Sequence, residues 1–246
     1  MQNYKFYVLN FREKCLCFGA SIGIAGVTAR LFYQNIYVTA GAVFLYFPVK
    51  RAVRDYLQKK RKREMLFHFK EILQMISTAL KAGYAMENAF AEAREEFVKL
   101  YGENNSIAKE FGYLNRQVQL NVPLETLLES LAERSGIEEI NSFSQVFGFA
   151  KRGGGDFMKI FRSTVDKIGQ KAEVMQEIEV LISAKRMEMN IMNLVPFGIL
   201  AYVGFTSPEF LKPLYGNLLG VGIMTGCLAG YVCACRIAKK IVDIQV

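Results

Sequence analysis

The sequence predicts an all-α membrane protein in which four transmembrane helices, two near each end of the chain, flank a cytoplasmic antiparallel bundle of six helices. Three observations lead to this prediction. Apolar stretches without charge lie near both ends of the 246-residue chain, and 52% of its residues are hydrophobic. Between residues 63 and 190 there is one proline, and apolar residues recur at helical spacing. Basic residues border the apolar stretches, as expected for membrane spans.

Residues 1–49 are predicted to form an N-terminal transmembrane hairpin with spans at about 15–33 and 34–49. The uncharged runs cover only 15–29 and 36–49, lengths that fit buried core helices equally well. Arg30 can snorkel to the interface and so extend the first span. Aromatic residues near the ends of both spans suit the interfacial belts of a membrane. A cleavable signal peptide that ends before Arg30 is the alternative interpretation.

Residues 191–246 are predicted to form a C-terminal transmembrane hairpin with a short cytoplasmic tail, and its spans cover about 189–206 and 214–235. The second span has no charged residue, and its length is sufficient to cross a hydrocarbon core of roughly 30 Å. Within it, Gly222, Gly226 and Gly230 have the GxxxGxxxG spacing that allows close helix–helix packing in lipid. The alternative is that glycine is simply common in membrane helices.

The basic residues predict the orientation of the spans. Arg12 and Lys14 precede the first span, eight basic residues occupy 50–63, and three more follow the last span (Arg236, Lys239 and Lys240). With four spans, all three regions face the cytoplasm. We therefore expect a multi-pass protein of the cell membrane with both termini and the central domain in the cytoplasm. The basic juxtamembrane segment 50–63 follows a span directly, which favours attraction to membrane lipid over binding of nucleic acid.

Residues 64–190 are predicted to form the cytoplasmic helical domain. Its first helix has apolar residues at helical spacing from Met65 to Leu80, and Gly83 ends it. Four more helices are expected at 86–101, 107–120, 123–134 and 137–151, with Pro123 as the first residue of its helix. A long sixth helix is expected to run into the third span.

The stretch KRGGGDFMKIF, residues 151–161, is a candidate for either a phosphate-binding loop or a turn. A glycine-rich loop that opens a helix can bind phosphate. However, the GxxxxGK[ST] pattern is missing, and a helix rather than a strand precedes the glycines. We interpret Gly153, Gly154, Gly155 and Asp156 as a hinge, in which the glycines end one helix and Gly155 or Asp156 caps the next.

No catalytic, cofactor-binding or metal-binding group is recognisable in the sequence. His68 has no Cys, Asp or Ser partner nearby, which favours a core or surface role. Glu138 and Glu139 are adjacent, so on a helix their side chains point about 100° apart and cannot act as a dyad. The five cysteines lie in apolar stretches without histidine or carboxylate at ligand spacing. We therefore expect a protein that is not an enzyme and uses no cofactor.

Three stretches resemble the type II secretion system F family in their order and spacing: LKAGYAMENAF (80–90), FAKRGGGDFMKIF (149–161) and EIEVLISAKRMEMNIMNLVPF (177–197). This family contains the inner-membrane platform proteins of type II secretion, type IV pili and tight-adherence pili. A single helical domain flanked by paired spans is similar to the tight-adherence branch of the family.

The resemblance implies a non-catalytic inner-membrane platform protein that couples a cytoplasmic secretion ATPase to the assembly of pilin-like subunits. It also implies the partners: a hexameric secretion ATPase, pilin-like subunits, and a paralogous platform subunit or a second copy of the chain. Two alternatives come from other classes. A permease subunit of a transporter would need polar residues along a path through the spans, and a membrane-anchored signalling enzyme would need a catalytic constellation.

Overall fold

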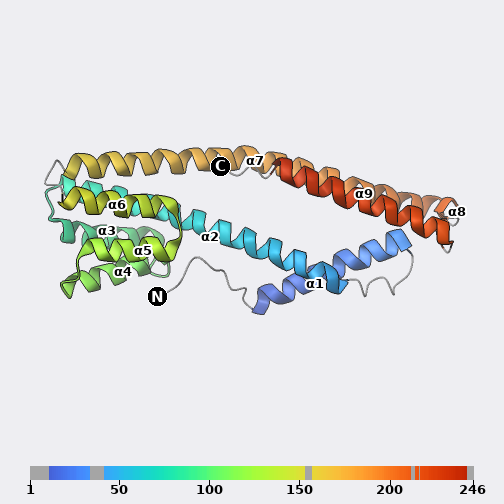
Figure 1. Cartoon of the computed structure of the whole chain (residues 1–246), viewed down its shortest axis with the longest axis horizontal. Coiled ribbons are helices and arrows are strands. Elements are labelled where there is room, and N and C mark those ends of the chain that lie inside the picture. The colour runs from blue at the N-terminus through green and yellow to red at the C-terminus, as the bar shows by residue number, and fades with distance from the viewer. Residues whose placement is uncertain (1–10, 34–41, 153–156, 212–213, 216, 243–246) are drawn as a thin grey trace. The chain divides into compact units, whose positions relative to one another are not determined.

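The computed structural model describes residues 11–33, 42–152, 157–211, 214–215 and 217–242, and this part of the chain is helical without a strand (Figure 1). The elements in chain order are α1 (Phe11–Thr28), η1 (Ala29–Tyr33), α2 (Ala42–Lys81), α3 (Met86–Tyr101), α4 (Ser106–Gln119), α5 (Leu124–Ser135), α6 (Glu138–Arg152), α7 (Phe157–Thr206), α8 (Pro208–Leu211) and α9 (Leu218–Val242). They divide into two compact units. Unit 1 comprises the described residues of 55–174, and unit 2 comprises those of 9–54 and 175–246.

The helices predicted between residues 65 and 151 are confirmed, with ends that differ by no more than two residues for α3, α4, α5 and α6. The prediction for Pro123 was wrong by one position: its ψ of 135° is extended, so Pro123 is the N-cap and α5 begins at Leu124. Residues 50–63 are helical throughout, because α2 continues past Pro48 to Lys81.

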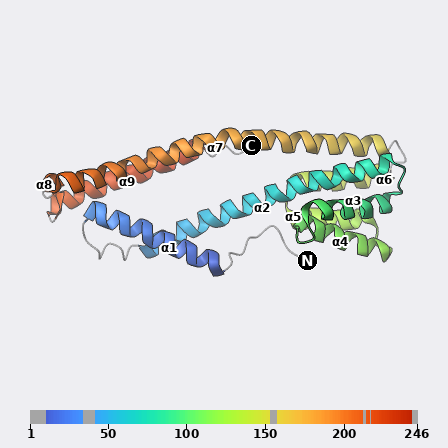
Figure 2. The same ribbon diagram turned by 180° about the vertical axis from the view of Figure 1, so that it is seen from behind.

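Unit 1 is organised around phenylalanine side chains from several helices. Phe143 of α6 contacts Phe69 of α2 and Phe161 of α7, with ring centroids 5.5 and 5.6 Å apart. Phe90 of α3 stacks on Phe111 of α4 at 5.9 Å. All five rings are buried. In unit 1, α6 lies beside the first part of α7, whereas α4 lies on the side of the bundle away from α7 in both views (Figures 1 and 2).

The connections in unit 1 follow local rules. Asn105 caps α4 by accepting a hydrogen bond from the backbone N–H of Ile107 at 2.9 Å. Gly136 ends α5 in the left-handed region, with φ 59° and ψ 33°. Lys62 of α2 donates a hydrogen bond to the carbonyl of Gly136 at 2.9 Å. One of the eight basic residues of segment 50–63 therefore stabilises the end of α5.

Unit 2 brings η1 together with the later part of α7 and the segment before α9. In the C-terminal hairpin, Tyr231 of α9 donates a hydrogen bond to the carbonyl of Asn193 in α7 at 2.7 Å, and α9 lies alongside the last part of α7 in both views. The hydroxyl of Tyr215 donates to the carbonyl of Leu31 at 2.7 Å. The rings of Phe32 and Phe197 are 6.0 Å apart. These contacts join η1 to α7 and to the turn that precedes α9.

Candidate functional site

Three described helices are long and apolar enough to cross a membrane: Phe11–Phe32, the apolar part of α7 (Phe157–Thr206) and Leu219–Val242. This supports a membrane protein. The fourth predicted span, 34–49, begins with residues 34–41, which lie outside the described residues. Its remainder forms the start of α2.

The apolar surface of these three helices is the most extensive candidate for a functional surface. Its large exposed side chains are Phe11, Leu16, Phe18, Ile22, Ile24 and Val27 on α1, Ile191, Met192, Leu194, Val195, Ile199, Tyr202 and Phe205 on α7, and Leu219, Val221, Ile223, Val232, Ile237 and Ile241 on α9. Soluble monomers rarely expose continuous apolar patches of more than a few hundred Å². Lipid chains are the environment in which such a surface is stable.

The predicted packing glycines lie on this exposed surface. Gly222, Gly226 and Gly230 of α9 are exposed, and a Cβ atom added to any of them meets no other atom within 4 Å. The described helices therefore do not pack against this face. By contrast, a Cβ on Gly220 collides with the backbone of Leu214, so close approach at the start of α9 requires a glycine there.

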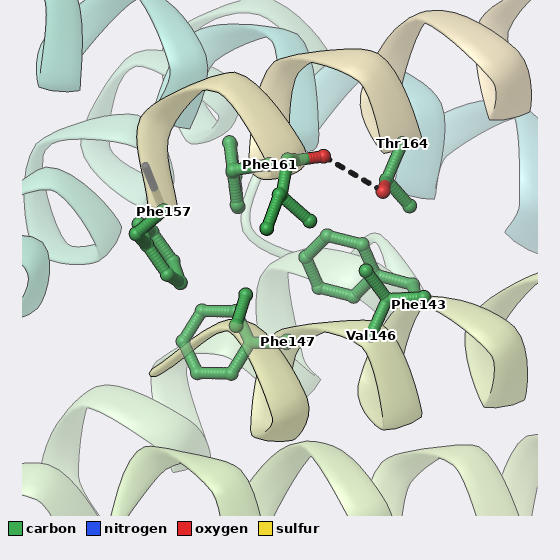
Figure 3. A pocket seen from close by; sticks show the side chains of 8 residues that line it. Phe143, Val146, Phe147, Phe157, Phe161 and Thr164 are labelled. Carbon is green, nitrogen blue, oxygen red and sulfur yellow. Dashed lines mark hydrogen bonds between the residues drawn. The ribbon is translucent and has the colours of Figure 1, made fainter. Parts of the chain in front are cut away.

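The predicted hinge residues Gly153, Gly154, Gly155 and Asp156 lie outside the described residues. The helices on either side of them are described. The facing sides of α6 and α7 line a hollow that leaves no room for a water molecule, formed by Phe143, Val146, Phe147, Ala150, Phe157, Ile160, Phe161 and Thr164 (Figure 3). Small-molecule pockets are far larger, at roughly 300–1,000 Å³, and contain a few polar groups that orient the ligand. The hydroxyl of Thr164 donates to the carbonyl of Ile160 in its own helix at 2.8 Å. This hollow is therefore suited to packing of apolar side chains.

Of the adjacent carboxylates Glu138 and Glu139, the second pairs with a lysine of another helix. Glu139 Oε1 accepts from Nζ of Lys171 in α7 at 2.7 Å, which makes this carboxylate part of an ion pair between α6 and α7. All five cysteines are free thiols. No group of three or more His, Cys, Asp or Glu side chains in the described ranges is placed to hold a metal ion.

Sequence reasoning missed a buried ion pair between α4 and α5. Arg134 donates from Nη1 and Nη2 to the two carboxylate oxygens of Glu110, at 3.0 and 2.8 Å. The exposed fractions of the side chains are 17% for Arg134 and 6% for Glu110. The available signal was the place of Glu110 on the apolar face of its helix, between Ile107 and Leu114. A charge at such a position requires a partner.

Replacing Glu110 with alanine is expected to lower the free energy of unfolding by about 3 kcal/mol, because Arg134 would stay buried without its partner. Urea unfolding of the detergent-solubilised chain, followed by circular dichroism, measures this loss. The matched control is Glu103→Ala, which removes the exposed partner of Arg94 and should cost less than about 1 kcal/mol. Equal losses in the two variants would contradict the role of burial.

His68 lies among aromatic rings at the interface of α2 and α3. Its ring centroid is 4.8 Å from that of Tyr101 and 5.7 Å from that of Phe97, and its buried Nδ1 has no hydrogen-bond partner. Burial lowers the pKa of His68 from its ordinary value, while the carboxylates of Glu64 and Glu71 act in the opposite direction. The site therefore holds the neutral imidazole in an apolar contact.

This lowered pKa predicts a pH dependence of stability. The unfolded chain binds a proton at His68 at higher pH than the folded chain, so the stabilisation is complete above about pH 6.5 and is lost as the pH falls through the lowered pKa. His68 is the only histidine in the chain. We expect the unfolding temperature to fall between pH 7.5 and 5.5 in the wild type and to change less in His68→Phe. Parallel curves for the two proteins would disprove this.

Comparison with known proteins finds no match among protein-family models, curated proteins or solved structures. The functional interpretation therefore depends on the residues themselves and on the resemblance described for the sequence.

Proposed function

We propose that the chain is a non-catalytic platform protein of the cell membrane, which couples a cytoplasmic secretion ATPase to the assembly of pilin-like subunits. In this proposal four spans anchor the chain, and the helices of unit 1 form a cytoplasmic six-helix bundle that docks on the hexameric ATPase. The resemblance to the type II secretion system F family supports the proposal. The filament subunits and a paralogous platform subunit, or a second copy of the chain, are the further partners.

The observation that carries the proposal is the continuity of α7. One helix supplies Phe161, Val165 and Ile168 to the buried core of unit 1 and then continues as the apolar segment that ends at Thr206. Its only proline is Pro196, within the apolar segment. A helix without a break transmits displacement between the segments it connects, because each turn is hydrogen-bonded to the next. A force applied to unit 1 would therefore reach the membrane through α7.

The proposed orientation has unit 1 and both termini in the cytoplasm. In unit 2, Leu31 and Phe32 contact Tyr215 and Phe197, so η1 lies toward the turn between α7 and α9. The basic residues Arg12 and Lys14 belong to the opposite end of α1, and Arg236, Lys239 and Lys240 belong to the end of α9 away from that turn. The basic ends of α1 and α9 can therefore face the same side of a membrane, which supports the orientation that the positive-inside rule predicts.

A permease subunit is the alternative from another class. Its best candidate residue is Asn193 in the apolar part of α7. The side-chain oxygen of Asn193 accepts from the thiol of Cys235 at 3.4 Å, and its carbonyl accepts from Tyr231. These polar groups pair with each other between α7 and α9, which favours a structural role in helix packing over a role in a substrate path.

Deletion of residues 65–190 tests the docking role. The truncated protein keeps the N-terminal segment and the C-terminal hairpin but lacks the domain proposed to bind the ATPase. We expect that membranes containing it no longer retain a co-expressed secretion ATPase, whereas membranes containing the full chain do, as measured by co-sedimentation. Retention of the ATPase by the truncated protein would eliminate unit 1 as the docking domain.

A further inference from the structure

Basic side chains from α1 and α2 are found at one end of the N-terminal hairpin in unit 2. Arg12 and Lys14 are exposed on α1, and Arg51 and Arg54 are exposed on α2. Lys50 is half-buried, with Nζ 5.7 Å from the ring centroid of Tyr46, one helical turn earlier. A cation held on an aromatic face in this way is partly ordered before any ligand binds.

A ring contact places these two groups of cations at the same end of the hairpin. Phe18 of α1 and Tyr46 of α2 are 6.0 Å apart and meet edge to face. From this contact, α1 runs back to its N-terminus and α2 runs forward toward the same end of unit 2 (Figures 1 and 2). Lys14 and Lys50 are each four residues from the contact, about 6 Å along their helices.

Exposed aromatic side chains accompany the cations. Phe11 is 77% exposed and Phe47 is 72% exposed. Aromatic rings are enriched where hydrocarbon meets the headgroups of a membrane. The acidic residues nearby are Glu13 and Asp55, and these two residues and Arg54 each have an interaction within the chain. The five cations therefore outnumber the carboxylates at the boundary between the apolar segments and the polar remainder of α2.

We propose that Arg12, Lys14, Lys50, Arg51 and Arg54 form a composite binding site for the headgroups of anionic phospholipids. The site rests on the membrane location proposed above, but not on the ATPase or the filament. Lipid phosphates are the anions nearest to cations at this depth, and guanidinium groups bind phosphate with paired hydrogen bonds. Lys62, which donates to Gly136, lies outside the site.

The positive charge of these five residues would also attract nucleic acid, but their position next to the apolar segments favours lipid. The cations begin within two residues of Phe11 in α1 and within three residues of Phe47 in α2. A nucleic acid would have to approach within a Debye length, about 8–10 Å, of a membrane surface that is itself anionic. Lipid headgroups face no such barrier.

The test uses the full chain reconstituted in nanodiscs of phosphatidylcholine that contain a trace of spin-labelled lipid. The fraction of motionally restricted label is measured for phosphatidylglycerol and for phosphatidylcholine. We expect a selectivity for phosphatidylglycerol of roughly fivefold in the wild type. It should fall to about one in the variant Lys14→Gln, Lys50→Gln, Arg51→Gln, Arg54→Gln, and also in the wild type at high salt.

Two controls separate the site from general charge and from misfolding. The variant Lys99→Gln, Lys109→Gln, Arg116→Gln removes exposed cations from α3 and α4 and should keep the wild-type selectivity. The variant Arg51→Lys, Arg54→Lys keeps the charge and should keep most of the selectivity. Equal selectivity in the wild type and the quadruple variant would overturn the proposal. So would binding of a DNA oligonucleotide that the quadruple variant loses while lipid selectivity is unchanged.

Discussion

If the proposed platform function holds, insertion of the flexible tetrapeptide Gly-Ser-Gly-Gly after Gln176 abolishes filament assembly without releasing the ATPase from the membrane. Gln176 is exposed, and it lies between Gly169, the last buried residue of α7 in unit 1, and the apolar segment of α7. Four residues of this composition do not continue a helix, since glycine in a helix interior costs about 1 kcal/mol per residue. Unit 1 and the spans keep their own contacts.

The matched control for this insertion is a helical heptapeptide, Ala-Glu-Ala-Ala-Lys-Ala-Ala, at the same position. Seven residues make nearly two turns, so the helix stays continuous. The residues after the insertion then point in almost the same direction around the helix axis as in the wild type. We expect filament assembly, counted by electron microscopy of cells, to be retained with the heptapeptide and lost with the tetrapeptide. Assembly in both strains would show that α7 does not transmit the force, whereas loss of the ATPase would reveal damage to unit 1.

Replacement of Phe143 with alanine is expected to destabilise unit 1 by about 4 kcal/mol, the cost of a large cavity in an aromatic core. Phe143 contacts Phe69, Phe147 and Phe161, which lie on α2, α6 and α7. Its loss therefore weakens the contact of α6 with two other helices at once. An effect of this size is a large part of the stability of a small domain.

Phe149 provides a control in the same helix. It is 71% exposed and contacts Arg152 with its ring face, at 5.6 Å from the guanidinium carbon. Phe149→Ala removes the same number of atoms and should cost less than about 1 kcal/mol. Urea unfolding of the detergent-solubilised proteins gives both values. If Phe149→Ala were as destabilising as Phe143→Ala, the division of α6 into a core face and a solvent face would be wrong.

The helices of unit 1 were predictable because their signals are local. Apolar spacing from Met65 to Leu80 and the glycines at 83 and 136 reflect turns of one helix and the backbone angles at its end. The unbroken course of α2 was not anticipated, because a proline at 48 and a dense run of like charges both argue against a helix. The contacts of the helix with the rest of unit 1, including Lys62 with Gly136, are long-range and outweigh this local preference.

The sequence could not predict which side chains pair between helices, because these contacts are also long-range. Glu110 and Arg134 are 24 residues apart and meet only when α4 and α5 pack together. The GxxxGxxxG motif was recognisable from its spacing, but the sequence did not identify the helix that packs against it. The described residues leave Gly222, Gly226 and Gly230 without a neighbour in this chain. The motif therefore says how closely a helix can approach, and not which helix does so.

The hydrogen bond from Tyr215 to Leu31 connects residues that are 184 positions apart. The ribosome adds about 5–20 residues per second, so Tyr215 is synthesised roughly 10–40 s after Leu31. If the chain is inserted in a membrane as proposed, α1 and η1 reach the bilayer before Tyr215 is made, and the carbonyl of Leu31 bonds to water or headgroups until then. Synthesis of Tyr215 and of the α9 helix that follows it therefore completes the contacts of η1 in unit 2.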